Sequence, residues 1–178
     1  MSIDITQKLL TPNKWSRPGT PIHKVKGLIM HWVGNPDTTA VFNRDYFEMR
    51  KNGMLGYGSA HFIIGLKGEV IQCIPLNEVA YHAGPTSETT KAARKVFGAY
   101  PNGCTLGIET CHLDWDGTYT RDTYHSMVKL AAWLCQQFGL TEDDIYTHHF
   151  IVGKDCPKWF VNNPDEWVKF INEVEVHR

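Results

Sequence analysis

The chain has 178 residues, 42% of them hydrophobic, which is enough to bury one core without disulfides, so we expect a single domain over residues 1–178. Eighteen Lys and Arg residues against 19 Asp and Glu residues leave the chain almost neutral, which argues against nucleic acid as a partner. No run of about 18 apolar residues occurs, and the first ten residues lack the regions of a secretory signal. We therefore expect synthesis in the cytoplasm without a signal peptide and no insertion into a membrane.

The five cysteines are odd in number and irregularly spaced. Disulfide frameworks of small secreted domains use even numbers of cysteines, so this pattern indicates reduced thiols. We also expect the protein to be a monomer.

The first third of the chain predicts an extended arm, a buried strand and a helix. Residues 1–24 carry three prolines and are expected to form an arm with at most one short strand or helix. Past Lys26, residues 25–31 are apolar on both faces of the predicted strand, which is typical of a strand covered on both sides. An amphipathic helix capped by Thr39 is predicted next, from the three- and four-residue steps between Phe42, Tyr46 and Met49.

A hairpin and a long loop follow. Residues 60–65 and 69–75 flank Gly68, whose freedom to adopt a positive φ suits the tight turn between two strands. Residues 83–104 show little period and are expected to form a long loop with one short helix. Loops of this length in a compact domain are more often functional than idle.

Residues 105–111 predict a strand with an informative face. Gly107, Glu109 and Cys111 share that face, because side chains alternate along a strand. A carboxylate flanked by two small residues is expected to stand in open space. Burying a charge in an otherwise apolar strand is costly, so a functional role for Glu109 is favoured over a structural ion pair.

The rest of the chain predicts helices. The longest begins after Thr120 and ends at Gly139, with apolar residues at helical spacing. A last helix is predicted after Asn163 as the cap and Pro164 as the first helical residue. Strands and helices alternate, so the expected fold class is α/β, a central mixed β-sheet flanked by helices.

Residues 147–157, THHFIVGKDCP, hold a histidine and a cysteine on either side of a bend. Gly153 and Pro157 rule out one continuous helix, so the chain turns between His148 and Cys156. Imidazole and thiolate are favoured zinc ligands, and the pair suggests two corners of a metal site. Alone, the pair is explained better by a buried histidine and an inert thiol.

The best candidate for a third ligand is His31, which ends an apolar run and is followed at once by loop residues. At this point the sequence resembles a known family, the zinc-dependent N-acetylmuramoyl-L-alanine amidases of the phage lysozyme and peptidoglycan-recognition-protein superfamily. The resemblance covers roughly the whole chain and rests on five segments in the family's order: LIMHWVGNP, SAHFIIG, VAYHAG, LGIETC and HHFIVGKDCP.

The resemblance implies that family's amidase fold, Zn²⁺ as cofactor and bacterial peptidoglycan as partner. It favours a site in which His31, His148 and Cys156 hold zinc and leave a fourth position open for water. An amide hydrolase also needs a proton carrier and a donor to the oxyanion, and these roles fall to Glu109 and Lys154. The expected reaction is hydrolysis of the bond between N-acetylmuramic acid and L-alanine, with Glu109 moving the proton to the departing amine.

Four more residues are weaker candidates for substrate binding. His61 and His82 resemble family positions that line the substrate groove, and Trp32 and Tyr57 could stack on sugar or stem peptide. One departure is Ala60, which stands where some relatives have a catalytic tyrosine. That difference makes Glu109 the better candidate for proton transfer.

Three alternatives remain open at this stage. Cys156 could be the nucleophile of a thiol amidase with His148 as its base. The chain could bind peptidoglycan without cutting it. It could also recycle soluble anhydro-muropeptides in the cytoplasm, although the motifs look more like a phage endolysin that reaches the wall after release, in which a wall-binding domain often follows the catalytic one.

Overall fold

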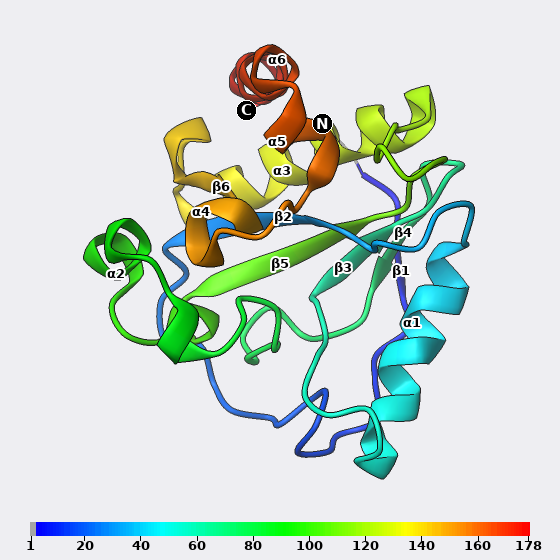
Figure 1. Cartoon of the computed structure of the whole chain (residues 1–178), viewed down its shortest axis with the longest axis vertical. Helices are drawn as coiled ribbons and strands as arrows, with labels where there is room; N and C mark the ends of the chain where they lie inside the picture. Colours follow the sequence, from blue (N-terminus) through cyan, green and yellow to red (C-terminus); the bar gives the residue numbers. More distant parts are fainter. Residues whose placement is uncertain (1–2) are drawn as a thin grey trace.

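The computed structural model describes residues 3–178, whose strands form a six-stranded sheet (Figure 1). The strands are β1 (Ile5–Gln7), β2 (Gly27–Trp32), β3 (Phe62–Ile64), β4 (Val70–Gln72), β5 (Thr105–Thr110) and β6 (Ile145–Thr147). Their order across the sheet is β1-β4-β3-β5-β2-β6. Only β3 and β4 pair antiparallel, as the predicted hairpin requires, and the other neighbours are parallel. The expected mixed sheet is therefore confirmed.

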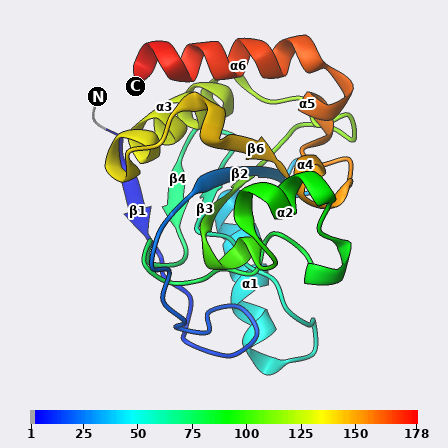
Figure 2. The same ribbon diagram turned by 90° about the vertical axis from the view of Figure 1, so that its left-hand side faces the viewer.

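Helices cover both faces of the sheet. They are α1 (Ala40–Met49), α2 (Lys91–Phe97), α3 (Arg121–Phe138), α4 (His148–Val152), α5 (Lys158–Asn162) and α6 (Pro164–His177). Figure 2 shows α3 and α6 stacked on one side of the sheet and α1 on the other. Among the described residues, no helix combines the length and the apolar character that crossing a membrane requires.

The central strands β2 and β5 are apolar because both faces of the sheet are covered. Leu28 and Met30 belong to the larger core cluster, which includes the inner face of α3. Ile29 points the other way and packs with Phe97 and Ile151, from α2 and α4. Full burial of such a side chain stabilises the fold by roughly 1.5–3 kcal/mol. The two central strands are thus a rigid base for residues at their carboxyl ends.

Helix α3 has the boundaries that the sequence predicts. The side chain of Thr120 accepts a hydrogen bond from the amide of Thr123, and Gly139 ends the helix in the left-handed conformation with φ of 64°. A side chain at Gly139 would strain this conformation. The short helix expected in the long loop is α2, capped by Thr90.

The apolar series used to predict α1 faces solvent rather than the core. The exposed fractions of Phe42, Tyr46 and Met49 are 56%, 41% and 59%. Helix α1 instead packs through Ala40, which is fully buried, and through Phe47. The helix and its Thr39 cap are confirmed, whereas its expected inner face is wrong because a small residue brings the helix close to the sheet.

The start of α6 also differs from the prediction. Pro164 is the first helical residue, as expected, but the side chain of Asn163 forms no cap. Its amide nitrogen donates to the carbonyl of Trp159 at 2.8 Å, because the unpredicted helix α5 ends at that point. Asn163 therefore stabilises the end of α5 and does not cap the start of α6.

Candidate metal centre and active site

Three potential metal ligands meet although they lie far apart in the sequence. His31 lies in β2, His148 is the first residue of α4, and Cys156 follows the α4 turn. One ligand atom from each lies within 4.8 Å of the others. All three side chains are buried, with exposed fractions of 2%, 7% and 7%. The structure therefore brings together the three residues that the sequence singled out.

The segment after β6 brings Cys156 back beside His148. Thr147 caps α4 by accepting from the amide of Phe150, and Gly153 ends the helix with φ of 75°. The amide of His149 then donates to the carbonyl of Cys156 at 2.8 Å, and Nδ1 of His149 bonds the carbonyl of Lys154 at 2.9 Å. His149, to which the sequence assigned no role, thus closes this loop from its backbone and its side chain.

Burial keeps the two candidate imidazole ligands neutral. Desolvation lowers the pKa of His31 well below its ordinary value, and the nearby His148, His82 and Lys154 add to the effect. Desolvation, followed by the charge of Lys154, lowers the pKa of His148 to about 4. Metal binding requires a free lone pair on the imidazole, and both rings have one at neutral pH.

Glu109 stands beside His31, because the two are register partners on β5 and β2. Burial raises the pKa of Glu109 to about 8. Its Oε2 is buried and has no hydrogen-bond partner among the described residues. A carboxyl group with a pKa near neutrality and a free oxygen is suited to proton transfer.

The candidate residues line one hollow of about 340 Å³. Its walls include His31, Glu109, His148, Lys154 and Cys156. Trp32 also lines it and stacks on His112, with ring centroids 4.5 Å apart. The three candidate metal ligands, the carboxylate and the lysine that the sequence proposed therefore lie around one hollow.

Of the two other histidines, His82 lines the hollow with a small part of its surface, whereas His61 is not among the lining residues. His61 has no exposed surface, and both of its ring nitrogens bond backbone atoms, the amide of Gly107 at 3.0 Å and the carbonyl of Glu78 at 2.9 Å. His82 is 6% exposed, and Nδ1 of His82 contacts Nε2 of His31 at 3.1 Å. Only His82 therefore reaches the hollow, and it does so with a small part of its surface.

The space over Gly107 is not open, contrary to the expectation for this strand face. A Cβ atom on Gly107 would lie 2.5 Å from Cγ of His82, which is too close for any real contact. The ring of His82 therefore fills the space beside Glu109. Sequence alternation identified the face correctly but could not show which distant side chain covers it.

A second hollow adjoins the first. It has a volume of about 420 Å³ and shares Tyr81 with the hollow that contains the candidate ligands. Tyr57 and Tyr100 also line it, with exposed fractions of 61% and 44%, and Asn102 lies at its wall. Sequence reasoning missed Tyr81, Tyr100 and Asn102, because they occur in or beside the long loop, where no period marks them.

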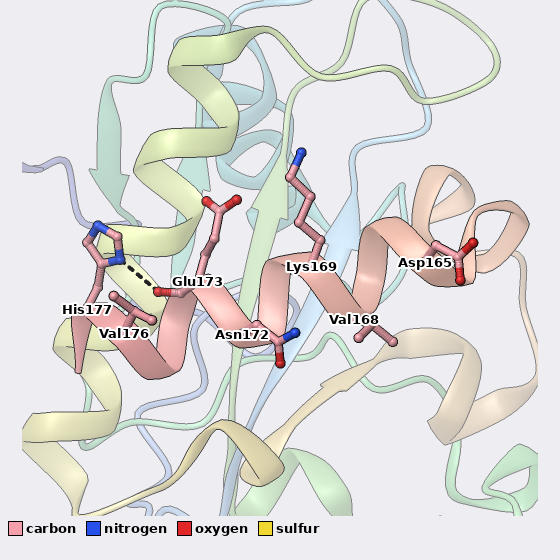
Figure 3. A pocket seen from close by; sticks show the side chains of 7 residues that line it. All are labelled: Asp165, Val168, Lys169, Asn172, Glu173, Val176 and His177. Carbon is pink, nitrogen blue, oxygen red and sulfur yellow. Dashed lines mark hydrogen bonds between the residues drawn. The ribbon is translucent and has the colours of Figure 1, made fainter.

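A third hollow, along the outer face of α6, has no such features. Figure 3 shows seven residues of this one helix around it, and its only drawn bond joins His177 to the backbone of Glu173. Val168 and Val176 leave 55% and 82% of their surface exposed there. Within residues 3–178, no cluster of buried polar groups lines this hollow, so it is not the candidate site.

The donor set fits zinc. Nδ1 of His31 and Sγ of Cys156 lie 3.7 Å apart. Two ligands on one tetrahedral zinc ion, with Zn–N and Zn–S bonds of about 2.0 and 2.3 Å, are separated by roughly 3.5 Å. In addition, Nε2 of His148 is buried without a hydrogen-bond partner among the described residues. Two imidazoles and one thiol in this spacing suit a divalent zinc ion better than a hard cation.

The structure disfavours Cys156 as a nucleophile. A catalytic cysteine needs a lowered pKa, since the thiolate is the reactive form. Burial, with the charge of Glu109 adding to it, raises the pKa of the Cys156 thiol instead. Without a metal, this thiol is protonated at neutral pH.

Solved structures of other proteins have the same fold. The structure of PlyL superposes with a TM-score of 0.79 at 22% identity and covers 99% of each chain. A mutant endolysin from Bacillus subtilis gives a TM-score of 0.74 at 23% identity, over 97% of this chain and 99% of that one. At 22% and 23% identity, these likenesses establish the fold of the chain.

Sequence comparison identifies the family. The profile of the N-acetylmuramoyl-L-alanine amidases matches residues 21–159, and the chain belongs to this family. It is 37% identical over 176 residues to the N-acetylmuramoyl-L-alanine amidase BlyA of Bacillus subtilis (strain 168), covering 96% of this chain and 46% of that protein. It is 31% identical over 175 residues to a probable N-acetylmuramoyl-L-alanine amidase of Bacillus licheniformis, covering 97% and 48%. The chain thus spans about half the length of these curated relatives.

Proposed function

We propose that this chain hydrolyses the amide bond between N-acetylmuramic acid and L-alanine in bacterial peptidoglycan, with one zinc ion as cofactor. The observation that supports this most strongly is the convergence of His31, His148 and Cys156 in the hollow that also holds Glu109. Membership of the amidase family supports the choice of bond.

In this proposal the three buried side chains hold zinc and leave a position open toward the hollow. Bound zinc supplies Lewis-acid chemistry, which polarises a carbonyl group and acidifies water. The neutral state of His31 and His148 prepares both rings for binding without prior loss of a proton. Cys156 must lose its proton on binding, because only the thiolate is a good ligand.

Glu109 and Lys154 carry the remaining chemistry. Glu109 takes a proton from the attacking water and delivers it to the departing amine of L-alanine, a task for which a pKa of about 8 is suited. Lys154 lines the same hollow, and its ammonium group stabilises the negative oxygen that develops when the amide carbonyl is attacked. Neither residue is a metal ligand in this scheme.

The substrate is proposed to extend from this hollow into the adjoining one. Trp32 borders the first hollow, and Tyr57 borders the second together with Tyr81 and Tyr100. Exposed aromatic rings stack on the apolar faces of sugars, and none of the described residues that line the second hollow is charged. We therefore assign the second hollow to a neutral sugar of the glycan strand.

The setting of the reaction is proposed to be the cell wall, reached after release of the protein from the cytoplasm. Recycling of soluble muropeptides would use the same chemistry on smaller fragments, and a pure binding module would use none of it. A comparison of intact walls with soluble muropeptides as substrates separates the first two settings.

Chelation tests the proposed function directly. Purified protein is incubated with phenanthroline, and the turbidity of a wall suspension is followed together with the release of free L-alanine amino termini. We expect activity to disappear and to return on addition of zinc. Activity that ignores the chelator but is lost to iodoacetamide would overturn the proposal in favour of a thiol enzyme, and absence of new amino termini would indicate a binding module.

A further inference from the structure

We propose that His82 is a positioning residue that fixes the tautomer of His31, so that Nδ1 of His31 is the atom offered to the metal. The inference extends the proposed function and rests on it, because it requires His31 to bind a metal ion. It assigns to His82 a role other than contact with substrate.

The geometry joins His82 to His31 on one side and to the backbone on the other. Nδ1 of His82 lies 3.1 Å from Nε2 of His31. Nε2 of His82 lies 3.4 Å from the carbonyl oxygen of Thr105 and 3.3 Å from its hydroxyl oxygen. On the far side of His31, Nδ1 is 3.7 Å from Sγ of Cys156. The four groups therefore form one chain that ends at the candidate metal centre.

The backbone determines the direction of the hydrogen bonds along this chain. A carbonyl oxygen only accepts, so Nε2 of His82 must carry the hydrogen that points to Thr105. The hydroxyl of Thr105 already donates to the carbonyl of Pro101 at 2.8 Å, so it too can only accept from His82. A neutral imidazole has one N–H group, and Nδ1 of His82 is therefore an acceptor.

The consequence for His31 follows at once. Its Nε2 faces an acceptor and must carry the hydrogen, which leaves the lone pair of Nδ1 free toward Cys156. The opposite tautomer would bring two lone pairs together between the rings and would leave a buried polar pair unsatisfied. Outer-shell partners of metal-bound histidines commonly fix the tautomer in this way.

Two further contacts hold the His82 ring in place. The amides of His82 and Ala83 both donate to Oδ1 of Asn102, at 3.1 and 2.8 Å. The ring lies against the backbone of Gly107, where a Cβ atom would come within 2.5 Å of it. The position of His82 is thus determined by backbone contacts that do not involve a metal, which makes it a stable reference for His31.

The first test measures zinc affinity at pH 7 by competition with a chromophoric chelator. His82→Asn keeps an acceptor at the δ position, whereas His82→Leu has similar bulk and no acceptor. We expect His82→Leu to weaken zinc binding about 10- to 100-fold and His82→Asn to restore most of the loss. The matched control is Cys135→Ala, which shortens a buried side chain of α3 in the larger core cluster, to which neither His82 nor a candidate ligand belongs, and it should leave zinc affinity unchanged.

The second test reads the tautomer directly in the unmodified protein. Long-range ¹H–¹⁵N spectra of the zinc-loaded protein should show His31 protonated at Nε2 and bound through Nδ1, and spectra of the chelator-treated protein should show the same Nε2 proton. His31 protonated at Nδ1, or equal zinc affinity in His82→Leu and the wild type, would overturn the role of His82. A wild-type protein that binds no zinc would refute the proposed function instead, and the tautomer of the metal-free protein would still decide the role of His82.

Discussion

His31 and Glu109 are register partners on the adjacent parallel strands β2 and β5. Partners on parallel strands point to the same face, so a candidate metal ligand and a candidate proton carrier are held side by side by backbone hydrogen bonds. Both lie near the carboxyl ends of their strands, where sheets of this kind commonly bind ligands. The chemistry proposed for the chain depends on this pairing.

Replacement of Glu109 separates proton transfer from metal binding. We expect Glu109→Gln to lower the rate of amide hydrolysis by about 10²- to 10⁴-fold, because glutamine cannot carry the proton. Zinc content should stay at the wild-type level, since Glu109 is not among the three grouped ligands. Full wall-lytic turnover in this variant would remove Glu109 from the mechanism.

Lys154 is tested in the same way with a lysine elsewhere as the control. Lys154→Met removes the charge from the hollow, and we expect kcat to fall by about 10²- to 10³-fold with a smaller change in KM. Lys169→Met, on the outer face of α6, should leave both constants unchanged. A loss confined to KM would assign Lys154 to ground-state binding instead.

The buried histidines should make the metal-free protein labile to acid. Desolvation lowers the pKa of His61 to about 4, so the ring is neutral in the folded protein and charged in the unfolded chain below about pH 6.5. Above pH 6.5 the ring is neutral in both states and does not affect stability. As the pH falls from 6.5 toward 4, the unfolded chain takes up a proton that the folded protein does not. The free energy of unfolding therefore falls by about 1.4 kcal/mol per pH unit.

Urea unfolding between pH 7.5 and 4.5 measures this effect. The dependence of the unfolding free energy on pH should be shallower in His61→Gln than in the wild type by about that amount per pH unit. The variant retains all other titrating groups, so the difference between the two slopes isolates the contribution of His61. Parallel curves for the two proteins would mean that His61 titrates normally.

Substitutions of the tyrosines in the second hollow should weaken substrate binding without slowing the chemical step. We expect Tyr57→Ala and Tyr100→Ala to raise KM on intact walls by about 2- to 12-fold, the value of one aromatic contact, with little change in kcat. Phe42→Ala removes an exposed aromatic residue that lies outside this hollow and should change neither constant. If the tyrosine variants lose affinity equally for a stem peptide that lacks the sugar, the hollow binds peptide rather than glycan.

Gly107 offers a test that leaves every titratable group in place. Gly107→Ala puts a methyl group into the ring of His82, and overpacking of this kind costs about 1–3 kcal/mol of stability. Displacement of His82 should also weaken zinc binding. A variant with wild-type unfolding free energy and wild-type zinc affinity would show that the ring can move without consequence.

The sequence predicted the elements of this fold well where periodicity and caps act locally. The boundaries of α3 follow from Thr120 and Gly139, and the hairpin follows from its central turn. The inner face of α1 was wrong because burial depends on how closely a helix approaches the sheet, and Ala40 permits that approach where larger residues do not. Capping of α6 by Asn163 failed because the neighbouring α5 takes its side chain.

In the candidate site, too, local features could be predicted from the sequence and contacts between distant segments could not. The bend between His148 and Cys156 could be predicted from Gly153 and Pro157. The grouping with His31 rested on its place at the end of an apolar run and on the resemblance in motif order, not on spacing. No local pattern could reveal that His82 lies between His31 and Thr105, because that contact joins three separate parts of the chain. The same limit hid Tyr81 and Tyr100 of the second hollow, whereas Tyr57 was already a candidate.

Metal analysis of the purified protein tests the central claim most directly. Zinc per chain is measured in the wild type and in the His31→Ala, His148→Ala and Cys156→Ala variants, with circular dichroism to verify that each is folded. We expect about one zinc ion per wild-type chain and a loss of bound zinc in every variant. A wild type that hydrolyses peptidoglycan without bound metal, or a folded variant that retains its zinc fully, would contradict a centre built from these three side chains.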